Sequence, residues 1–494
     1  MDIKELATKA KDPASVKDVI SDLMNHRFTP QPDVDVALKA IDPKQHDIMD
    51  ETIRKDKWVK IDSNDESNEE NVINVMAGND DNENKRGNMR REKVARIAVA
   101  LQRKIINTSV SFVLGTPVTY EATATTENEQ IAVNALRKII KSVKAKSFDR
   151  KVARAIFGFR ECAEVWYTIE GDQKHNKYGF ETKFKLRCKM ISPANGYTLY
   201  PYFDETGDMV AFSYKYSVKN DDKTVDYFET YTSENQFRWQ RGENGYELME
   251  GFPKPNPIGK IPVVYGYQDY YETEDVNALI DRLELLLSNF ADTNDYHASP
   301  KIFVTGQING WSKKGESGAV IEGEDGATMQ YVSWQNAPES VKLEIETLLK
   351  LIYSITQTPD ISFDTIKGLN VSGVALKLMF MDAHLKVQDK SEIFDDYFTR
   401  RANILLAFIG MMNNKVKSEA ASLEVEPVIT PYMITDDMAT LEYWMTANGN
   451  KAVISQQESV EKAGLTTDSK VTMQKINEEA DKDNAFIIGE PIDG

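Results

Sequence analysis

One helical pattern constrains the fold more than any other feature of the sequence. Beyond Gly373, apolar residues recur at intervals of three and four as far as Met412, and no proline lies between Pro359 and Pro427. We therefore predict a long, kinked helix within residues 373–426 that reaches about 60 Å. A helix longer than any single core needs packing partners along its length, and copies of the same chain are the simplest source.

Two more helices are predicted on either side of a small β insertion. Apolar residues at helical spacing predict a helix from Thr273 to His297, about 37 Å long, which Pro300 ends. A matching pattern begins at Pro338 and ends near residue 357. Short β-branched and aromatic runs fill residues 301–335 between them, so we expect a hairpin of helices with a β-rich tip.

Residues before the hairpin give three helical patterns and then a β-rich region. The helices are predicted over 90–114, 128–146 and 148–158, and short strands follow from Val165 to Gln240. The proline-rich stretch 253–262 ends this antiparallel unit.

The two ends of the chain look different from its middle. Residues 1–60 contain short amphipathic stretches broken by Pro30, Pro32 and Pro43, which predict a loosely packed arm. The acidic stretches 62–71 and 78–84 are too polar to bury and predict exposed loops. Residues 427–494 read as acidic helices. The chain as a whole is predicted to be α+β.

Composition limits what a chain of 494 residues can do. This length suggests about three domains or one elongated subunit of several parts. A formal charge of −18 argues against tight binding of nucleic acid, which needs clustered Lys and Arg. No apolar run is long enough for a membrane helix, and the N-terminal sequence has no secretory pattern. With two cysteines, Cys162 and Cys188, we expect synthesis in a reducing cytoplasm.

The sequence offers little support for catalysis. It has no phosphate-binding loop, no G-x-G-x-x-G between a strand and a helix, no H-E-x-x-H and no C-x-x-C. We therefore expect no cofactor, no metal and no enzyme activity. The acid pairs Asp395-Asp396 and Asp436-Asp437 leave open a carboxylate-metal nuclease. Adjacent helical residues point about 100° apart, however, and acids are frequent in this chain, so we do not favour that hypothesis.

Two features of the sequence carry a family resemblance. One is the order of elements: helix, β insertion, helix, loop, long helix. The other is a set of segments: Phe112–Pro117, Ile191–Pro193, Tyr197–Tyr200, Asn256–Val264, Ala452–Ser455 and Gln474–Glu479. Together they resemble the portal proteins of tailed bacteriophages, in the SPP1-type family.

The resemblance implies a ring, usually of about twelve subunits, at one capsid vertex. Double-stranded DNA would enter and leave through it without sequence-specific contacts. The implied partners are the terminase large subunit, a head-completion or adaptor protein, and the major capsid and scaffold proteins. The implied location is the virion, after assembly in the host bacterial cytoplasm. Another head–tail adaptor or capsid-vertex protein is the alternative interpretation.

The resemblance also divides the chain into parts. They are an N-terminal arm and acidic linker (1–89), a wing (90–272), a stem helix (273–298), a clip (299–337), a second stem helix (338–357), a tunnel loop (358–372), a long helix of wing and tunnel (373–426) and a crown (427–494).

Candidate site residues follow from this division. The acidic first stem helix agrees with it independently, because the wall of a conduit should not hold phosphates strongly. Lys367 and the amides beside Gly368 are the hypothetical DNA contact, unless Lys367 is an ordinary loop lysine. The expected DNA-facing loop residues are Thr365, Ile366, Lys367, Gly368, Leu369, Asn370 and Val371; the channel-lining stem residues are Glu274, Asp281, Glu284 and Glu346; the clip contacts are Trp311, Lys313, Lys314 and Trp334.

Overall fold

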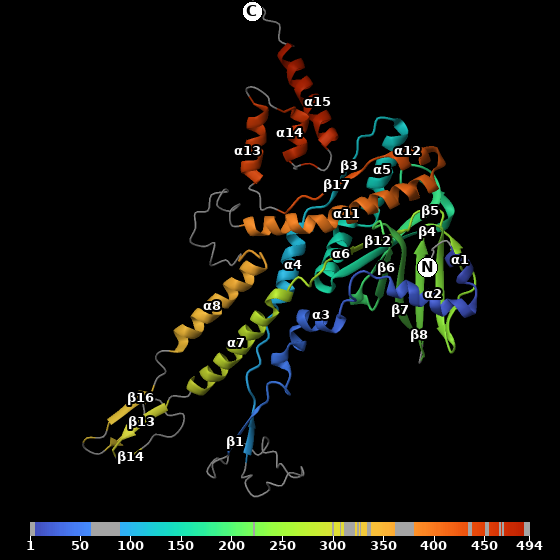
Figure 1. Cartoon of the computed structure of the whole chain (residues 1–494). Coiled ribbons are helices and arrows are strands. Elements are labelled where there is room, and N and C mark those ends of the chain that lie inside the picture. Colours follow the sequence, from blue (N-terminus) through green and yellow to red (C-terminus); the bar gives the residue numbers. More distant parts are fainter. Residues whose placement is uncertain are drawn as a thin grey trace, which may run out of the picture. The chain divides into compact units, whose positions relative to one another are not determined.

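A computed structural model of the chain divides it into two compact units (Figure 1). The first comprises Met1–Asp360 and Asp382–Pro431, and the second comprises Ile361–Met381 and Tyr432–Gly494. The structure describes residues 5–60, 89–220, 223–298, 301–306, 308–310, 322–323, 326, 328–332, 337–360, 380–432, 437–449, 454–463, 466 and 469–488. The predicted acidic loops at 62–84 lie outside these residues.

Two antiparallel sheets form the centre of the first unit. One has the order β10-β9-β8-β7-β6, with β11 paired to β9, and the other has the order β12-β4-β5. The predicted β-rich region is confirmed. The strands are β4 (Glu161–His175), β5 (Thr182–Ile191), β6 (Thr198–Phe203), β7 (Met209–Asn220), β8 (Lys223–Thr232), β9 (Asn235–Gly242), β10 (Gly245–Leu248), β11 (Lys254–Pro255) and β12 (Val263–Tyr267).

Alternation along the strands divides their side chains between two cores. Phe212 and Tyr214 of β7 pack with Ala163 and Val165 of β4, so this core lies between the two sheets. Ala211, one residue from Phe212, faces the opposite side of its sheet and belongs to a separate cluster.

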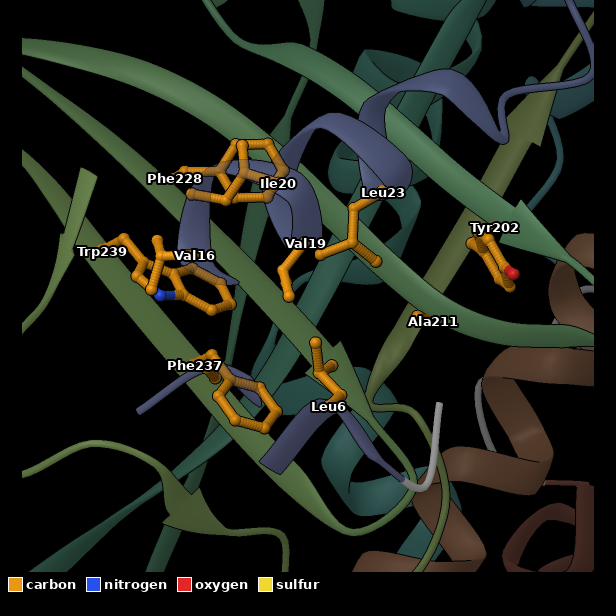
Figure 2. Close-up of a cluster of buried hydrophobic side chains, with 11 residues drawn as sticks. Leu6, Val16, Val19, Ile20, Leu23, Tyr202, Ala211, Phe228, Phe237 and Trp239 are labelled. Carbon is orange, nitrogen blue, oxygen red and sulfur yellow. The ribbon is translucent and has the colours of Figure 1, made fainter. Parts of the chain in front are cut away.

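The second cluster buries the N-terminal helices (Figure 2). Leu6 of α1 (Leu6–Lys9) and Leu23 of α2 (Pro13–Asn25) pack on Phe237 and Trp239 of β9 and are at most 1% exposed. Arg27 then donates a 2.7 Å hydrogen bond to the buried carboxylate of Glu161. The prediction of a loosely packed arm is therefore wrong. The prolines interrupt the helices, but the apolar residues between them complete the core of the sheet.

Shorter elements connect this arm to the helices of the first unit. Thr126 and Glu129 form a capping box that begins α5. The predicted second and third helices are confirmed as α5 and α6, but the first begins at Leu101 and not at Arg90. The elements are α3 (Val34–Ile41), η2 (Pro43–Gln45), η3 (Asp47–Met49), β1 (Lys57–Lys60), β2 (Met89–Glu92), α4 (Leu101–Leu114), β3 (Thr119–Glu121), α5 (Glu127–Ser142), α6 (Ala145–Phe159) and η6 (Pro193–Asn195).

The predicted helical hairpin is present. Helices α7 (Asn277–Ala298) and α8 (Ala337–Ile355) pack side by side, after a short η7 (Glu274–Val276) (Figure 1). Two antiparallel strand pairs lie between them in the sequence. These strands are β13 (Lys301–Thr305), β14 (Ile308–Gly310), β15 (Glu322–Gly323) and β16 (Thr328–Val332).

The long helix α11 runs from Met381 to Met412, 32 residues and about 48 Å. It ends at Met412, the last residue of the predicted apolar pattern, because Asn413 is extended and its side chain accepts a hydrogen bond from the Lys415 amide, which starts η8 (Asn414–Val416). Helix α12 (Lys417–Ser422) and β17 (Glu426–Val428), which pairs with β3, complete the first unit.

The second unit is helical where the structure describes it, as predicted for the tail. It contains α13 (Asp437–Asn448), α14 (Gln456–Ala463) and α15 (Ser469–Ile488), and α14 packs against both of the others. None of the described helices in either unit has the length and hydropathy needed to cross a bilayer.

Candidate functional site

The hairpin of α7 and α8 is built on one apolar seam. Ile280 and Leu283 of α7 pack with Leu348 and Ile352 of α8 and with Ile105 of α4. Each of these side chains is at most 8% exposed. Helical spacing places them on one stripe of each helix, so the hairpin is fixed to the rest of the first unit through α4.

A segment that enters α4 lies along α7 and is held by the side chains of that helix. The backbone amides of Ala95, Ile97 and Val99 donate hydrogen bonds of 2.7, 2.9 and 2.7 Å to Asp292, Ser288 and Glu284. Two residues of an extended chain span about 6.8 Å and four residues of a helix about 6.0 Å, so the two periods match. We call residues 95–99 the strap.

Glu284 also binds a buried histidine. Its Oε1 atom lies 2.7 Å from Nδ1 of His46, and Nε2 of His46 lies 3.2 Å from the carbonyl of Ala40. A carbonyl and an ionised carboxylate both only accept hydrogen bonds, so this arrangement suits an imidazole with protons on both ring nitrogens. Burial opposes the charged form, but the hydrogen bond to Glu284 and its negative charge raise the pKa of His46 above its usual value. The pair is therefore an imidazolium–carboxylate ion pair.

A second charged cluster joins the end of α8 to the start of α11. Lys386 and Lys390 of α11 lie 2.5 and 3.3 Å from the two carboxylate oxygens of Glu272, and Lys386 also donates to the carbonyl of Thr356. Burial opposes ionisation of Glu272, but the two ammonium groups lower its pKa. Glu272 thus holds two lysines of α11, and one of them, Lys386, also binds the backbone that follows α8.

A third cluster lies deeper, where α11 crosses the sheet of β4. Arg401 donates to both carboxylate oxygens of Glu164 at 2.7 Å and to Asp149 of α6 at 2.6 Å. All three side chains are at most 5% exposed. Gly266 of β12 makes this packing possible, because a Cβ there would lie 2.9 Å from the ring of Tyr397.

Three aliphatic side chains of α8 are exposed among polar residues such as Lys342 and Lys350. Leu343, Leu351 and Ile355 are 66%, 44% and 49% exposed, and Leu285 of α7 is 39% exposed. Leu351 is eight positions beyond Leu343 and Ile355 is four beyond Leu351, so at about 100° per residue the three side chains lie within an arc of about 120°. We call these three residues the α8 stripe.

Comparison with known proteins gives the family. The model of a family described as "Phage portal protein, SPP1 Gp6-like" matches residues 44–485, nearly the whole chain. The chain belongs to this family of phage portal proteins. Its members are structural proteins of the phage particle, so the fold described above is that of a portal subunit. No curated protein matches the chain.

Solved structures with similar folds are more distant. They include the neck of a native GTA particle computed with C12 symmetry and the neck of an empty GTA particle computed with C6 symmetry. Each has 11% identity and a TM-score of 0.38, and covers 74% of this chain and 89% of the other. The virion of a native gene transfer agent particle gives 11% identity and a TM-score of 0.37, with the same coverage. Likenesses of this degree say nothing about what this chain binds.

The four acids predicted to line the channel of this portal family member differ in their exposure to solvent. Glu274, Asp281 and Glu346 are exposed. Glu284 is 1% exposed and is bonded to His46 and to the strap. The prediction that Glu284 lines a channel is therefore wrong, because its charge serves inside the subunit.

The other predicted site residues lie outside the described residues. These are the loop residues 365–371 and the clip residues Trp311, Lys313, Lys314 and Trp334. The alternative metal site has Asp395 and Asp396 exposed on α11. Among the residues that the structure describes, no group of three or more His, Cys, Asp or Glu side chains is placed to hold a metal ion.

Sequence reasoning missed the three buried charge clusters. The sequence did contain one signal. Lys386, Lys390 and Arg401 fall on the side of α11 that carries its apolar residues, and a charged residue on that side is expected to be buried with a partner. Their partners, Glu272, Glu164 and Asp149, lie more than a hundred residues away in the sequence. No local pattern connects them.

Proposed function

We propose that this chain is the portal subunit that forms a ring at one capsid vertex, through which double-stranded DNA is packaged and ejected. The observation that carries the proposal is the match to the portal family over residues 44–485. In this proposal the α7–α8 hairpin is the stem, β13–β16 the clip, residues 358–372 the tunnel loop and 427–494 the crown. The clip docks the terminase motor and later a head–tail connector protein.

The α8 stripe supports assembly of the ring. Three exposed aliphatic side chains on one side of a helix lose contact with water when a neighbouring copy covers them, at about 25 cal/mol per Å² of apolar surface. No described segment of the same chain covers them. A contact between two different faces of identical chains closes into a ring when its rotation allows.

The exposed acids support the role of the stem. Glu274, Asp281 and Glu346 give it a negative surface that repels phosphates and so lets DNA slide. Lys367, in the proposed tunnel loop, would supply a local contact. Lys367→Ala is expected to change DNA packaging or retention while rings still form, and unchanged packaging would remove this lysine from the proposal.

Native mass spectrometry with particle images tests the ring. Twelve chains of 56.0 kDa give about 670 kDa, and we expect that species with an axial hole. The Leu343→Glu/Leu351→Glu variant should remain monomeric, because charges replace the apolar contact. Val218→Glu is the matched control, since Val218 is an exposed aliphatic residue of β7 (37%) outside the hairpin. A wild-type chain that is monomeric even with its scaffold protein would refute the proposed function.

A further inference from the structure

Strand β5 carries a row of basic residues at every second position. Lys183, Lys185, Arg187 and Lys189 alternate with other residues, and side chains two apart in a strand share a face. The ammonium of Lys189 is occupied, because it lies 4.7 Å from the ring centre of Tyr197 and 5.3 Å from that of Tyr216. The other three side chains are exposed, and within the described residues they form no ion pair. We call Lys183, Lys185 and Arg187 the β5 row.

The residues of β4 directly opposite Lys185 and Arg187 carry no negative charge, whereas the exposed acids Asp172, in the irregular stretch of β4, and Glu181 lie toward the Lys183 end of the row. Tyr167 of β4 lies opposite Arg187, and Ile169 lies opposite Lys185. Directly opposed residues in antiparallel strands share a face, and both side chains are exposed, at 42% and 48%. Glu170 lies opposite Phe184 and therefore faces the other side. Around Lys185 and Arg187 the exposed face of β4 and β5 thus presents cations, a phenol and an isoleucine, and acidic residues lie toward its Lys183 end.

The outer edge of β5 is partly occupied, because the Leu186 amide donates a 3.0 Å hydrogen bond to the Tyr178 hydroxyl and the Phe184 amide donates one of 3.2 Å to Oγ1 of Thr182. In the described part of the chain, β5 pairs only with β4 and forms the edge of the sheet β12-β4-β5. Lysine, arginine and tyrosine side chains are groups through which proteins contact DNA phosphates. The β5 row and Tyr167 bring these three kinds of side chain together on one face.

We propose that this face binds the phosphate backbone of double-stranded DNA, outside the channel and without sequence preference. Cations two residues apart along a strand are about 6.8 Å apart, which equals the axial rise of two nucleotides in one DNA strand. A straight, evenly spaced row fits a regular polyanion better than the irregular acids of a protein surface. The choice of DNA rests on the proposed function, which brings that polymer to this chain.

Salt-dependent binding of a short random-sequence duplex tests the site on the full-length protein. The variant Lys183→Gln/Lys185→Gln/Arg187→Gln removes three phosphate contacts. The slope of log K against log salt should therefore fall by about 2.7, at 0.9 per contact. The control variant Lys11→Gln/Lys17→Gln/Lys141→Gln removes three exposed lysines that do not form a row, with the same change in net charge. We expect the control to keep the wild-type slope.

Four results would overturn the site. They are no DNA binding by the wild type, an equal loss in both variants, loss of ring formation in the row variant with unchanged DNA affinity, and aggregation of that variant with unchanged DNA affinity. The third would assign the row to a neighbouring copy, and the fourth to protection of the sheet edge. Native mass is measured in parallel. Row-dependent DNA binding by a chain that never forms rings would support the site while refuting the proposed function.

Discussion

Arg401 offers the sharpest test of how the long helix is held. Its guanidinium makes three charge-assisted hydrogen bonds of 2.6–2.7 Å with Glu164 and Asp149, and none of the three groups is more than 5% exposed. Arg401→Met keeps most of the volume but leaves two carboxylates buried without a cation. Removing one partner of such a network costs about 3–5 kcal/mol. We expect a loss of stability of that size.

A compensating variant separates charge from packing. Arg401→Met/Glu164→Met/Asp149→Leu removes all three charges at similar volume, and replacing a whole buried ion network with apolar side chains of similar volume is often nearly neutral. We expect it to recover most of the stability that Arg401→Met loses. The stability of Arg401→Lys should lie between that of the wild type and that of Arg401→Met. Lysine keeps the positive charge, but its ammonium group cannot bind both carboxylates with the paired geometry of a guanidinium.

Urea unfolding followed by tryptophan fluorescence measures these differences. Trp166 is a suitable reporter, because it is 1% exposed and donates a 2.9 Å hydrogen bond to Glu164. The slope of free energy against urea should stay constant, so that midpoints can be compared. A cost below about 1 kcal/mol for Arg401→Met, or no recovery in the triple variant, would refute the reasoning.

Two further predictions concern His46 and the N-terminal helices. Because folding raises the pKa of His46 above 6.5, its pair with Glu284 stabilises the fold fully below about pH 6.5, and this contribution is lost as the pH rises through the folded-state value. Urea midpoints at pH 6 and 9 should differ less in His46→Asn than in the wild type, and identical profiles would contradict the ion pair. Leu23→Ala should cost about 2–5 kcal/mol, because Leu23 is fully buried on the sheet, whereas Leu38→Ala, at a 39% exposed position, should cost under about 0.5 kcal/mol in the same assay.

Much of the fold could be predicted from local pattern. Alternation and turns located the strands from β4 to β9, and helical spacing located α5, α6, α7 and α8 to within a few residues. These elements are recognisable because each buries one face, and a buried face leaves a period in the sequence. The order of these elements along the chain was in turn one of the features that carried the family resemblance.

The errors share a physical cause, which is that the partner was not local. Residues 1–60 contain few apolar positions between prolines, yet Leu6 and Leu23 fill a core provided by β9, more than two hundred residues away. Glu284 was assigned to a surface because it lies on an acidic helix. In the structure Glu284 is buried beside His46. The sequence gives no sign of this contact, because His46 lies far from Glu284 along the chain.

The strap shows that a helical spacing of apolar residues can also occur in an extended segment. Val94, Ile97 and Ala98 continue the apolar spacing of α4, so the sequence predicts a helix from Arg90. In the structure, residues 89–92 are already paired with β1, and the amides of residues 95, 97 and 99 bind the polar side of α7. If this segment were helical, its amides would donate hydrogen bonds to carbonyls of the same helix. Asp292, Ser288 and Glu284 would then lose these donors. Extended chain is favoured because buried acceptors on another element need its hydrogen-bond donors.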